Sequence, residues 1–257
     1  MRLKVIPGLL CLAVIFGQPS SRAQEKPDLP TADTVLNQYI EATGGKAAYE
    51  KLKNRVSIGT IEIPAANIKG TLKLTQAAPN QALLFFELGP AGGETRRGTD
   101  GKTAWEVSTL LGERDLDGDE RDAFIRDTNF YKELLWKDLY TKVECVGIED
   151  VNGKPAYKIV LTPKSGKPIT EYYDKTTHLV VKQTSTTASP MGEITVETVP
   201  SDFKTVDGVL IPFTATQTVL TQEIVMKLTE IKHNVNLPAD AFKRPGKAEE
   251  PAKTKAN

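Results

Sequence analysis

The fold of this chain is decided by residues Ile68–Gln76, which read IKGTLKLTQ. Apolar or small residues at Ile68, Gly70, Leu72 and Leu74 alternate with lysines and threonines. A period of two is typical of a β-strand that has one face in a core and the other face in water. The stretch therefore predicts a half-buried strand.

Turn signals recur on both sides of this strand. The pairs Asp100-Gly101, Asn152-Gly153 and Asp207-Gly208 each lie between strand-like runs, and such pairs accept the positive φ values of tight hairpin turns. Neighbouring strands are therefore expected to be antiparallel. Looser turns divide the rest of the chain, at Pro79-Asn80, Ser165-Gly166 and Lys175–His178. Together these signals predict roughly ten to twelve strands.

A single sheet of that width has to curl, because the twist accumulates from strand to strand. The expected fold is mainly β, in the α+β class. We predict a strongly curved antiparallel sheet that forms a half-open barrel and is capped or plugged by short helices.

Two short helices are expected before the sheet. Thr31-Ala32-Asp33 introduces the first helix, whose apolar residues fall on one face, and Gly44-Gly45 ends it. A second helix is predicted over Lys46–Leu52.

The β pattern is interrupted once, between Asp117 and Tyr140. Asp117 followed by Glu120 resembles a capping box, and apolar residues then follow at largely helical spacing, at Ala123, Phe124, Tyr131, Leu134, Leu135, Trp136, Leu139 and Tyr140. A helix with so broad an apolar surface is normally buried. We expect this helix to plug the concave side of the sheet.

Residues Met1–Ala23 have the three parts of a secretory signal peptide. Arg2 and Lys4 supply positive charge, Val5–Phe16 is mostly apolar, and small residues surround a cleavage site near Ala23. The apolar stretch is shorter than the about 20 residues that a membrane span needs. The sequence therefore predicts an exported, periplasmic protein with one domain over residues 24–242 and a disordered tail over residues 243–257, which are rich in Lys, Glu, Pro and Ala.

Cysteine and charge content narrow the class further. A lipid-attachment site at Cys11 is an alternative to simple cleavage, although Cys11 lies in the middle of the apolar stretch. After cleavage only Cys145 remains, so no internal disulfide is expected, which fits a bacterial periplasm. The 33 basic residues are balanced by 33 acidic ones. Because binding to nucleic acid calls for a basic face, no nucleic-acid partner is expected.

Residues that carry catalysis or metal binding are few. His178 and His233 belong to no metal or catalytic motif, and both are interpreted as ordinary turn or surface residues. Cys145 lies within a strand-like run and is interpreted as a small buried residue. A catalytic site made of two paired carboxylates is an alternative that stays open, because the sequence does not say which acidic residues meet in space. We expect no enzyme, no cofactor and no metal.

Two charged motifs are interpreted structurally. Asp115, Asp117 and Asp119 have the spacing of a calcium loop, but Glu120 stands where the loop needs glycine. These acids are better explained as the first turn of a helix, where they interact favourably with the helix dipole. The pair Arg96-Arg97 is interpreted as a solvated strand edge rather than an anion site.

Five segments together resemble the bacterial outer-membrane lipoprotein-sorting proteins, the family of the carrier LolA and the receptor LolB. They are Leu36–Gly45, Asp100–Trp105, Gly153–Lys158, Tyr172–Lys175 and Asp207–Pro212. The resemblance extends from about Thr31 to Phe242. It implies a half-open antiparallel barrel capped by helices, with an apolar cavity for the acyl chains of a lipoprotein.

A carrier of this kind needs a cavity, since each methylene kept from water contributes about 0.8 kcal/mol and a sixteen-carbon chain roughly 12 kcal/mol. The candidate wall residues are the apolar members of inward-facing sets. They are Leu72, Leu74, Leu84, Phe86, Trp105, Phe124, Leu135, Trp136, Leu139, Tyr157, Ile159 and Leu161. In any β-barrel, residues at such positions would simply form the core, and this interpretation is favoured for each of them. We expect the segment from Asp117 to Tyr140 to move as a lid.

Three functions remain open at this point. The first is a monomeric periplasmic carrier of lipid or lipoprotein acyl chains, loaded and unloaded by envelope membrane proteins. The second is an envelope-stress sensor or protein-interaction module with the same fold. The third is a hydrolase of envelope substrates, for which the sequence offers no nucleophile and base pair. The absence of a usable lipid-attachment cysteine favours a diffusing carrier like LolA over an anchored receptor like LolB.

Overall fold

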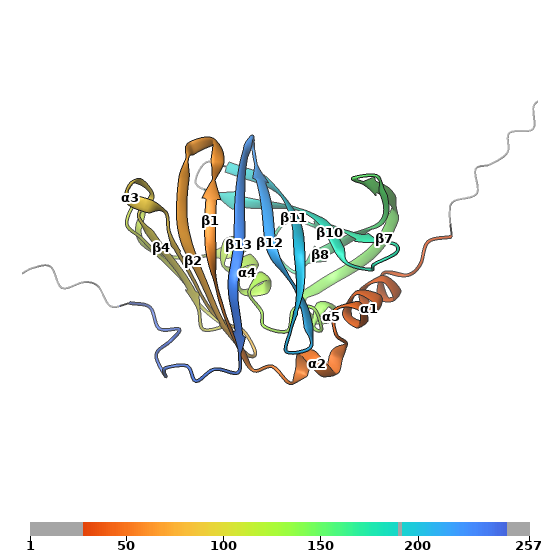
Figure 1. Cartoon of the computed structure of the whole chain (residues 1–257), viewed down its shortest axis with the longest axis horizontal. Helices are drawn as coiled ribbons and strands as arrows, with labels where there is room; N and C mark the ends of the chain where they lie inside the picture. The colour runs from red at the N-terminus through yellow and green to blue at the C-terminus, as the bar shows by residue number, and fades with distance from the viewer. Residues whose placement is uncertain (1–27, 190–191, 246–257) are drawn as a thin grey trace, which may run out of the picture.

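The computed structural model describes residues 28–189 and 192–245. The predicted signal peptide, with Cys11, lies outside these residues. The described strands form one antiparallel sheet with the order β6-β5-β4-β3-β2-β1-β13-β12-β11-β10-β9-β8-β7. Its two edge strands, β6 and β7, do not pair with each other, so the sheet curls without closing (Figure 1). The predicted half-open barrel of mainly β structure is confirmed.

The sheet has thirteen strands, slightly more than the roughly ten to twelve predicted. Their bounds are β1 Asn54–Ile63, β2 Ile68–Ala77, β3 Gln81–Glu87, β4 Glu94–Thr99, β5 Ala104–Ser108, β6 Gly112–Asp115, β7 Tyr140–Val151, β8 Lys154–Pro163, β9 Ile169–Asp174, β10 Val180–Ser189, β11 Gly192–Val206, β12 Val209–Val219 and β13 Gln222–His233. The shortest of them, β6, has four residues. A strand that short is too brief to produce a readable period of two.

The alternation in β2 and the predicted hairpins are present. Leu72 is only 5% exposed, whereas its neighbours Thr71 and Lys73 face solvent. Asn152 and Gly153 both have positive φ values, 54° and 80°. A turn with positive φ at both central residues matches the twist of the strands that it joins.

Two helices precede the sheet, α1 (Ala32–Ala42) and α2 (Lys46–Glu50). The Thr31 hydroxyl accepts a hydrogen bond from the Thr34 amide at 3.2 Å and so caps α1. Helix α2 ends two residues earlier than predicted, although Leu52 is still buried.

The single helix predicted between Asp117 and Tyr140 is wrong, because the segment forms two helices. They are α4 (Gly118–Asp127) and α5 (Trp136–Leu139). The Thr128 hydroxyl donates to the Phe124 carbonyl at 2.6 Å, and the Asn129 side chain accepts from the Tyr131 amide at 3.0 Å. Such local side-chain bonds compete with the helical ladder and end it.

The predicted capping box does not form either. Asp117 occupies the N-cap position of α4 without a side-chain hydrogen bond, and Glu120 binds arginines on the sheet instead. Helix α4 has no buried residue, whereas α5 buries Trp136. Only the second half of the segment therefore has the burial that its apolar residues predicted.

Helix α4 lies within the curl of the sheet, behind β13 in the view of Figure 1. Its first turn reaches both halves of the sheet. The Glu120 carboxylate binds Arg97 on β4 and Arg114 on β6, and the Asp119 carboxylate accepts a hydrogen bond from the Ser165 hydroxyl, in the turn between β8 and β9. Helix α4 therefore bridges the two sides of the open barrel.

Short connections complete the fold, with a single 3₁₀ turn at Pro64–Ala66 and the short helix α3 at Gly89–Gly92. Within the described ranges, no helix has both the length and the apolar character to span a bilayer. Arg244, in the stretch predicted as a tail, donates to Asp115 at 2.8 Å. Residues 246–257 of that predicted tail lie outside the described part of the chain.

Candidate ligand-binding cavity

A cavity with a volume of about 550 Å³ lies on the inner side of the sheet. It lies between one half of the sheet and the helices α1, α2 and α5. The sheet contributes mainly β8 to β12, together with Arg55 at the start of β1. Apolar wall residues include Leu36, Trp136, Leu161 and Ile211.

One part of the cavity wall is a band of four polar side chains, which we call the polar band. Glu171, Gln183, Thr198 and Gln217 lie on the adjacent strands β9, β10, β11 and β12, and they are directly opposite one another in register. All four line the cavity. The cavity is therefore amphipathic, whereas the family resemblance implied an apolar one.

Tyrosines surround the Glu171 carboxyl group. The Tyr173 hydroxyl donates a hydrogen bond to Glu171, and the rings of Tyr39 and Tyr173 meet edge to face with 5.5 Å between their centroids. Burial raises the pKa of Glu171, whereas the Tyr173 hydrogen bond lowers it by a smaller amount. Burial also raises the pKa of both tyrosines, so their hydroxyls stay protonated and can donate.

A chain of hydrogen bonds ties the end of α4 to the sheet beside the cavity. The Arg55 guanidinium donates to the Gln76 side-chain oxygen through Nε at 3.2 Å and Nη2 at 2.6 Å. Gln76 Nε2 in turn donates to the Thr128 carbonyl at 3.0 Å. Burial lowers the pKa of Arg55, yet an arginine keeps its charge under all ordinary conditions. The contact holds the segment between α4 and α5 over the cavity.

Of the twelve predicted wall residues, Trp136 and Leu161 line this cavity. The other ten do not belong to its lining. Ile159 is fully buried in the core between α1 and β8, and Tyr157 packs against the same core. Phe124, Leu135 and Leu139 lie on or next to α4 and α5, where each is partly buried.

Leu72, Leu74, Leu84, Phe86 and Trp105 lie on the other half of the sheet, in β2, β3 and β5. Leu72 opposes Phe86, and Leu74 opposes Leu84, so these four share the face that carries Arg97. Trp105 is different, since it opposes Gly98, the neighbour of Arg97. Side chains alternate between faces along a strand, so Trp105 points to the other side of the sheet. The prediction that Trp105 faces inward with the other four residues is therefore wrong.

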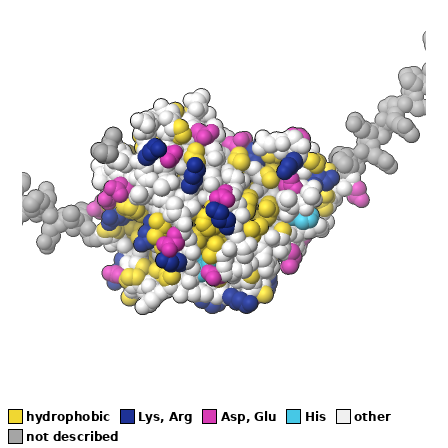
Figure 2. All heavy atoms as spheres, in the orientation of Figure 1, with side chains coloured by type: hydrophobic (Ala, Val, Ile, Leu, Met, Phe, Trp, Pro, Cys, Tyr) yellow, Lys and Arg dark blue, Asp and Glu magenta, His cyan; other side chains and the backbone are white. Residues whose placement is uncertain are grey.

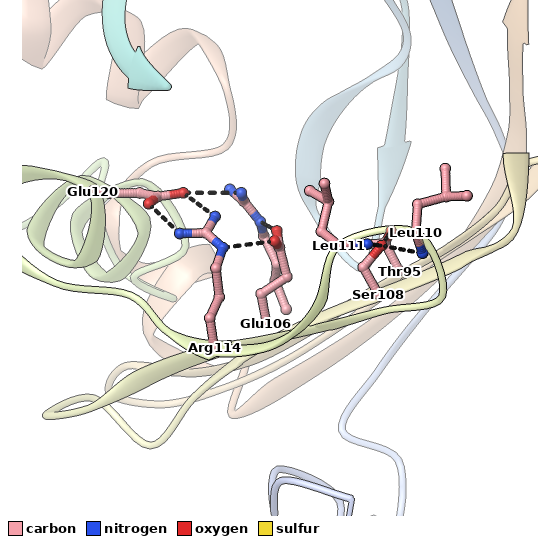
Figure 3. A network of polar contacts seen from close by, with 8 residues as sticks. Thr95, Glu106, Ser108, Leu110, Leu111, Arg114 and Glu120 are labelled. Carbon is pink, nitrogen blue, oxygen red and sulfur yellow. Dashed lines mark hydrogen bonds and ion pairs between the residues drawn. The ribbon is translucent and has the colours of Figure 1, made fainter. Parts of the chain in front are cut away.

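The same inner face carries an ion-pair network that sequence reasoning missed. Arg97, Glu106 and Arg114 oppose one another on β4, β5 and β6, and Glu120 of α4 completes the group (Figure 3). Arg114 binds Glu106 at 2.9 Å and both oxygens of Glu120 at 2.7 Å, while Arg97 binds Glu106 and, at 3.0 Å, Glu120.

The Glu106 side chain is only 3% exposed, and two positive groups balance two negative ones. The hydrogen bonds from Arg114 lower the pKa of Glu120. Arg97 is therefore not the solvated edge residue that was predicted. The available signal was the pairing of opposite charges across two successive hairpins, Arg97 with Glu106 and Glu106 with Arg114.

Of the two histidines, His178 lies in a turn, as predicted, with a φ of 60°. His233 is not the surface residue that was predicted, because its side chain is only 1% exposed. Its Nδ1 lies 2.9 Å from an Asp207 carboxylate oxygen, and burial lowers its pKa. Cys145 is half-buried against the core beside α1, and burial raises the pKa of its thiol. In the part of the chain that the structure describes, no group of three or more His, Cys, Asp or Glu side chains is arranged to hold a metal ion.

No known protein family and no curated protein matches the sequence of this chain. Several solved structures are similar in fold, among them the following three. A LolA superfamily protein from Nitrosomonas europaea is 12% identical with a TM-score of 0.58, and the match covers 84% of this chain and 99% of that one. A DUF1329 family protein from Desulfovibrio piger is 12% identical with a TM-score of 0.56 over 82% and 97%.

A protein domain from Vibrio parahaemolyticus, described as an outer membrane lipoprotein-sorting domain, is 13% identical. Its TM-score is 0.53, and the match covers 82% of this chain and 97% of that domain. The chain therefore has a LolA-like fold. At this level of identity the likeness concerns the fold alone.

Proposed function

We propose that this protein is an exported carrier that shields the alkyl chain of a lipid or lipoprotein in the cavity between β8–β12 and the helices. The observation that carries the proposal is the cavity of about 550 Å³ on the inner face of a LolA-like half-barrel. Pockets of ~300–1,000 Å³ are typical of sites that enclose one small ligand.

The apolar part of the wall supplies the binding energy. Leu36, Trp136, Leu161 and Ile211 come from α1, α5, β8 and β12, so one chain could contact helices and sheet at the same time. Burying an alkyl chain there removes about 0.8 kcal/mol of unfavourable hydration per methylene. An open surface could not hold a chain with comparable security.

Uptake and release require an opening, and α4 is the element suited to provide it. It crosses the open side of the barrel and has no buried residue of its own. Its contacts with the sheet are polar, through Asp119, Glu120 and the Thr128 carbonyl. Contacts of this kind leave groups that water can hydrogen-bond when a lid opens, which a buried apolar contact does not.

The proposed site of action is the periplasm, as the signal-like residues 1–23 predict. The proposed partners are acyl chains and the envelope membrane proteins that would load and unload them. No catalytic step is part of this proposal.

A variant that fills the cavity tests the carrier function directly. Ala215 on β12 lines the cavity, and its neighbour Thr216 points to the opposite face of the sheet. Protein purified gently from exporting cells should show a bound lipid in native mass spectrometry. Ala215→Phe should lose that lipid, whereas the matched control Thr216→Phe should keep it.

Circular dichroism should confirm that both variants are folded. A wild-type protein that carries no lipid, or a folded Ala215→Phe variant that carries as much lipid as the wild type, would contradict the proposal.

A further inference from the structure

A ligand that is only an alkyl chain does not explain why the cavity wall contains the polar band. Glu171, Gln183, Thr198 and Gln217 form a continuous band across four neighbouring strands, and every member lines the cavity. A core built only to hold hydrocarbon would place apolar residues at these positions, as it does at Ile159, which opposes Glu171.

Three members of the band have unused hydrogen-bonding capacity. Within residues 28–189 and 192–245, the side chains of Gln183, Thr198 and Gln217 form no hydrogen bond with the protein, and all three are partly exposed towards the cavity. Each amide offers two donors and an acceptor, and the threonine hydroxyl offers one donor and two acceptor lone pairs. An alkyl chain that displaced water from these groups would leave them unpaired, which is costly. The ligand therefore has to bring polar atoms of its own to this band.

The charges around the cavity indicate what kind of polar group fits. Asp127, Glu133 and Glu171 supply three carboxyl groups to the lining, whereas Arg55 and Lys132 supply two cations. The Arg55 guanidinium already donates to Gln76. Asp127 and Glu133 offset these two cations, and burial favours the neutral form of Glu171. The lining therefore offers no excess of either charge to an ionic head group. Amides and a hydroxyl are the matching partners for neutral hydroxyl or amide groups.

We propose that the ligand is a single-chain amphiphile with a neutral head group of hydroxyls or amides, and that Glu171, Gln183, Thr198 and Gln217 hold this head group. The inference rests on the proposed carrier function and adds the chemical class of the ligand. It makes the band a specificity element, while the apolar wall supplies affinity for the chain.

Three probes with the same alkyl chain separate the head-group chemistries. Binding of monolaurin, dodecanoate and dodecylamine to the purified protein is measured by isothermal titration calorimetry, below the concentration at which each probe forms micelles. Monolaurin should bind at least about ten-fold more tightly than dodecanoate, which is the ratio expected from one or two net hydrogen bonds. It should also bind more tightly than dodecylamine.

The double variant Gln183→Leu/Gln217→Leu should remove this preference, because it leaves the cavity similar in size but takes away both amides. The matched control is Thr184→Val/Thr218→Val, which changes the adjacent residues on the opposite face of the same two strands. The control should keep the full preference for monolaurin.

The outcomes distinguish the two proposals. Equal or tighter binding of dodecanoate or dodecylamine would overturn the neutral head group and leave the carrier function intact. An unchanged preference in a folded Gln183→Leu/Gln217→Leu variant would overturn the role of the band. Failure of all three probes to bind would contradict the carrier function itself, and with it this inference.

Discussion

Glu171 is a carboxyl group on the inner face of β9, where the protein excludes much of the surrounding water. Burial disfavours its charged form and raises its pKa above the ordinary value of 4.5. The native state therefore keeps a proton at pH values where the unfolded chain has released it. Stability must then fall as the pH rises from about 4.5 through the pKa of the folded state, since the native state binds more protons than the unfolded one.

Glu171→Gln should remove this loss of stability. The glutamine oxygen can still accept the Tyr173 hydrogen bond, but the side chain no longer titrates. Urea denaturation at pH 5 and pH 8 should show a smaller decline for the variant, by about 1.4 kcal/mol for each pH unit between the two pKa values of Glu171. At pH 8 the variant should be more stable than the wild type.

Glu223→Gln provides the control, because Glu223 is an exposed residue of β13. It should leave the pH dependence of unfolding unchanged. A Glu171→Gln variant with the same pH dependence as the wild type would show that burial of this carboxyl group does not govern the effect.

At the scale of elements, α1 is docked on the sheet through its C-terminal end. Gly44 follows the helix with a φ of 127°, and a Cβ atom at this position would lie 2.2 Å from the Gly208 carbonyl oxygen. The Leu210 amide donates to the Thr43 carbonyl at 2.8 Å across the same junction. The close approach of the helix end to the β11–β12 hairpin thus depends on the missing side chain.

Gly44→Ala should therefore destabilise the protein through both backbone strain and a clash with the hairpin. We expect a loss of about 2–5 kcal/mol in the free energy of unfolding, measured by urea denaturation. Gly153→Ala is the matched control, since Gly153 has a φ of 80° but nothing within 4 Å of its added Cβ atom. It should cost about 1 kcal/mol, from strain alone. Equal losses in the two variants would refute a tight junction.

Elements of this fold were predictable where the signal is local. The alternation of Ile68–Gln76 and the Asn152-Gly153 turn depend on neighbouring residues only. The turn is found as predicted, and the alternation is found up to Leu74, whereas Thr75 on the predicted solvent face is buried. The break between α4 and α5 was missed because it depends on how the Thr128 and Asn129 side chains bond to the backbone. Periodicity alone cannot distinguish these bonds from a continuous helix.

The cavity was less predictable because its polar band is assembled by register. Gln183 and Thr198 look like ordinary strand residues in the sequence, and they meet Glu171 only through the pairing of three strands. A shift of one residue reverses the face of every side chain, and a bulge between Val180 and Lys182 makes such a shift in β10. No local sequence pattern predicts a bulge of this kind.

At the scale of the whole molecule, the barrel is open on the side that α4 crosses. The outer face of the sheet, seen in Figure 2, mixes charged and apolar side chains. Glu120 attaches α4 to β4 and β6, and Asp119 attaches it to the turn that holds Ser165. Because these two anchors lie at opposite parts of the sheet order, the helix can open only if at least one of them is released.

A disulfide in place of the second anchor should therefore lock the cavity. The Asp119 and Ser165 side chains are in hydrogen-bond contact, so cysteines at these two positions would place a disulfide where the polar anchor now stands. In a Cys145→Ser background, oxidised Asp119→Cys/Ser165→Cys should take up and release a fluorescent lipid at least about ten-fold more slowly than the reduced form, since the lid motion is blocked. Adding dithiothreitol should restore both rates.

The appropriate control is a disulfide that leaves α4 free. Thr95 and Ser108 are opposite each other on β4 and β5 and share a hydrogen bond of 3.1 Å, so Thr95→Cys/Ser108→Cys cross-links the sheet without touching the helix. This variant should exchange lipid at the wild-type rate in both redox states. Exchange that is equally fast with α4 pinned would mean that the lipid enters by another route and that α4 is a fixed plug rather than a lid.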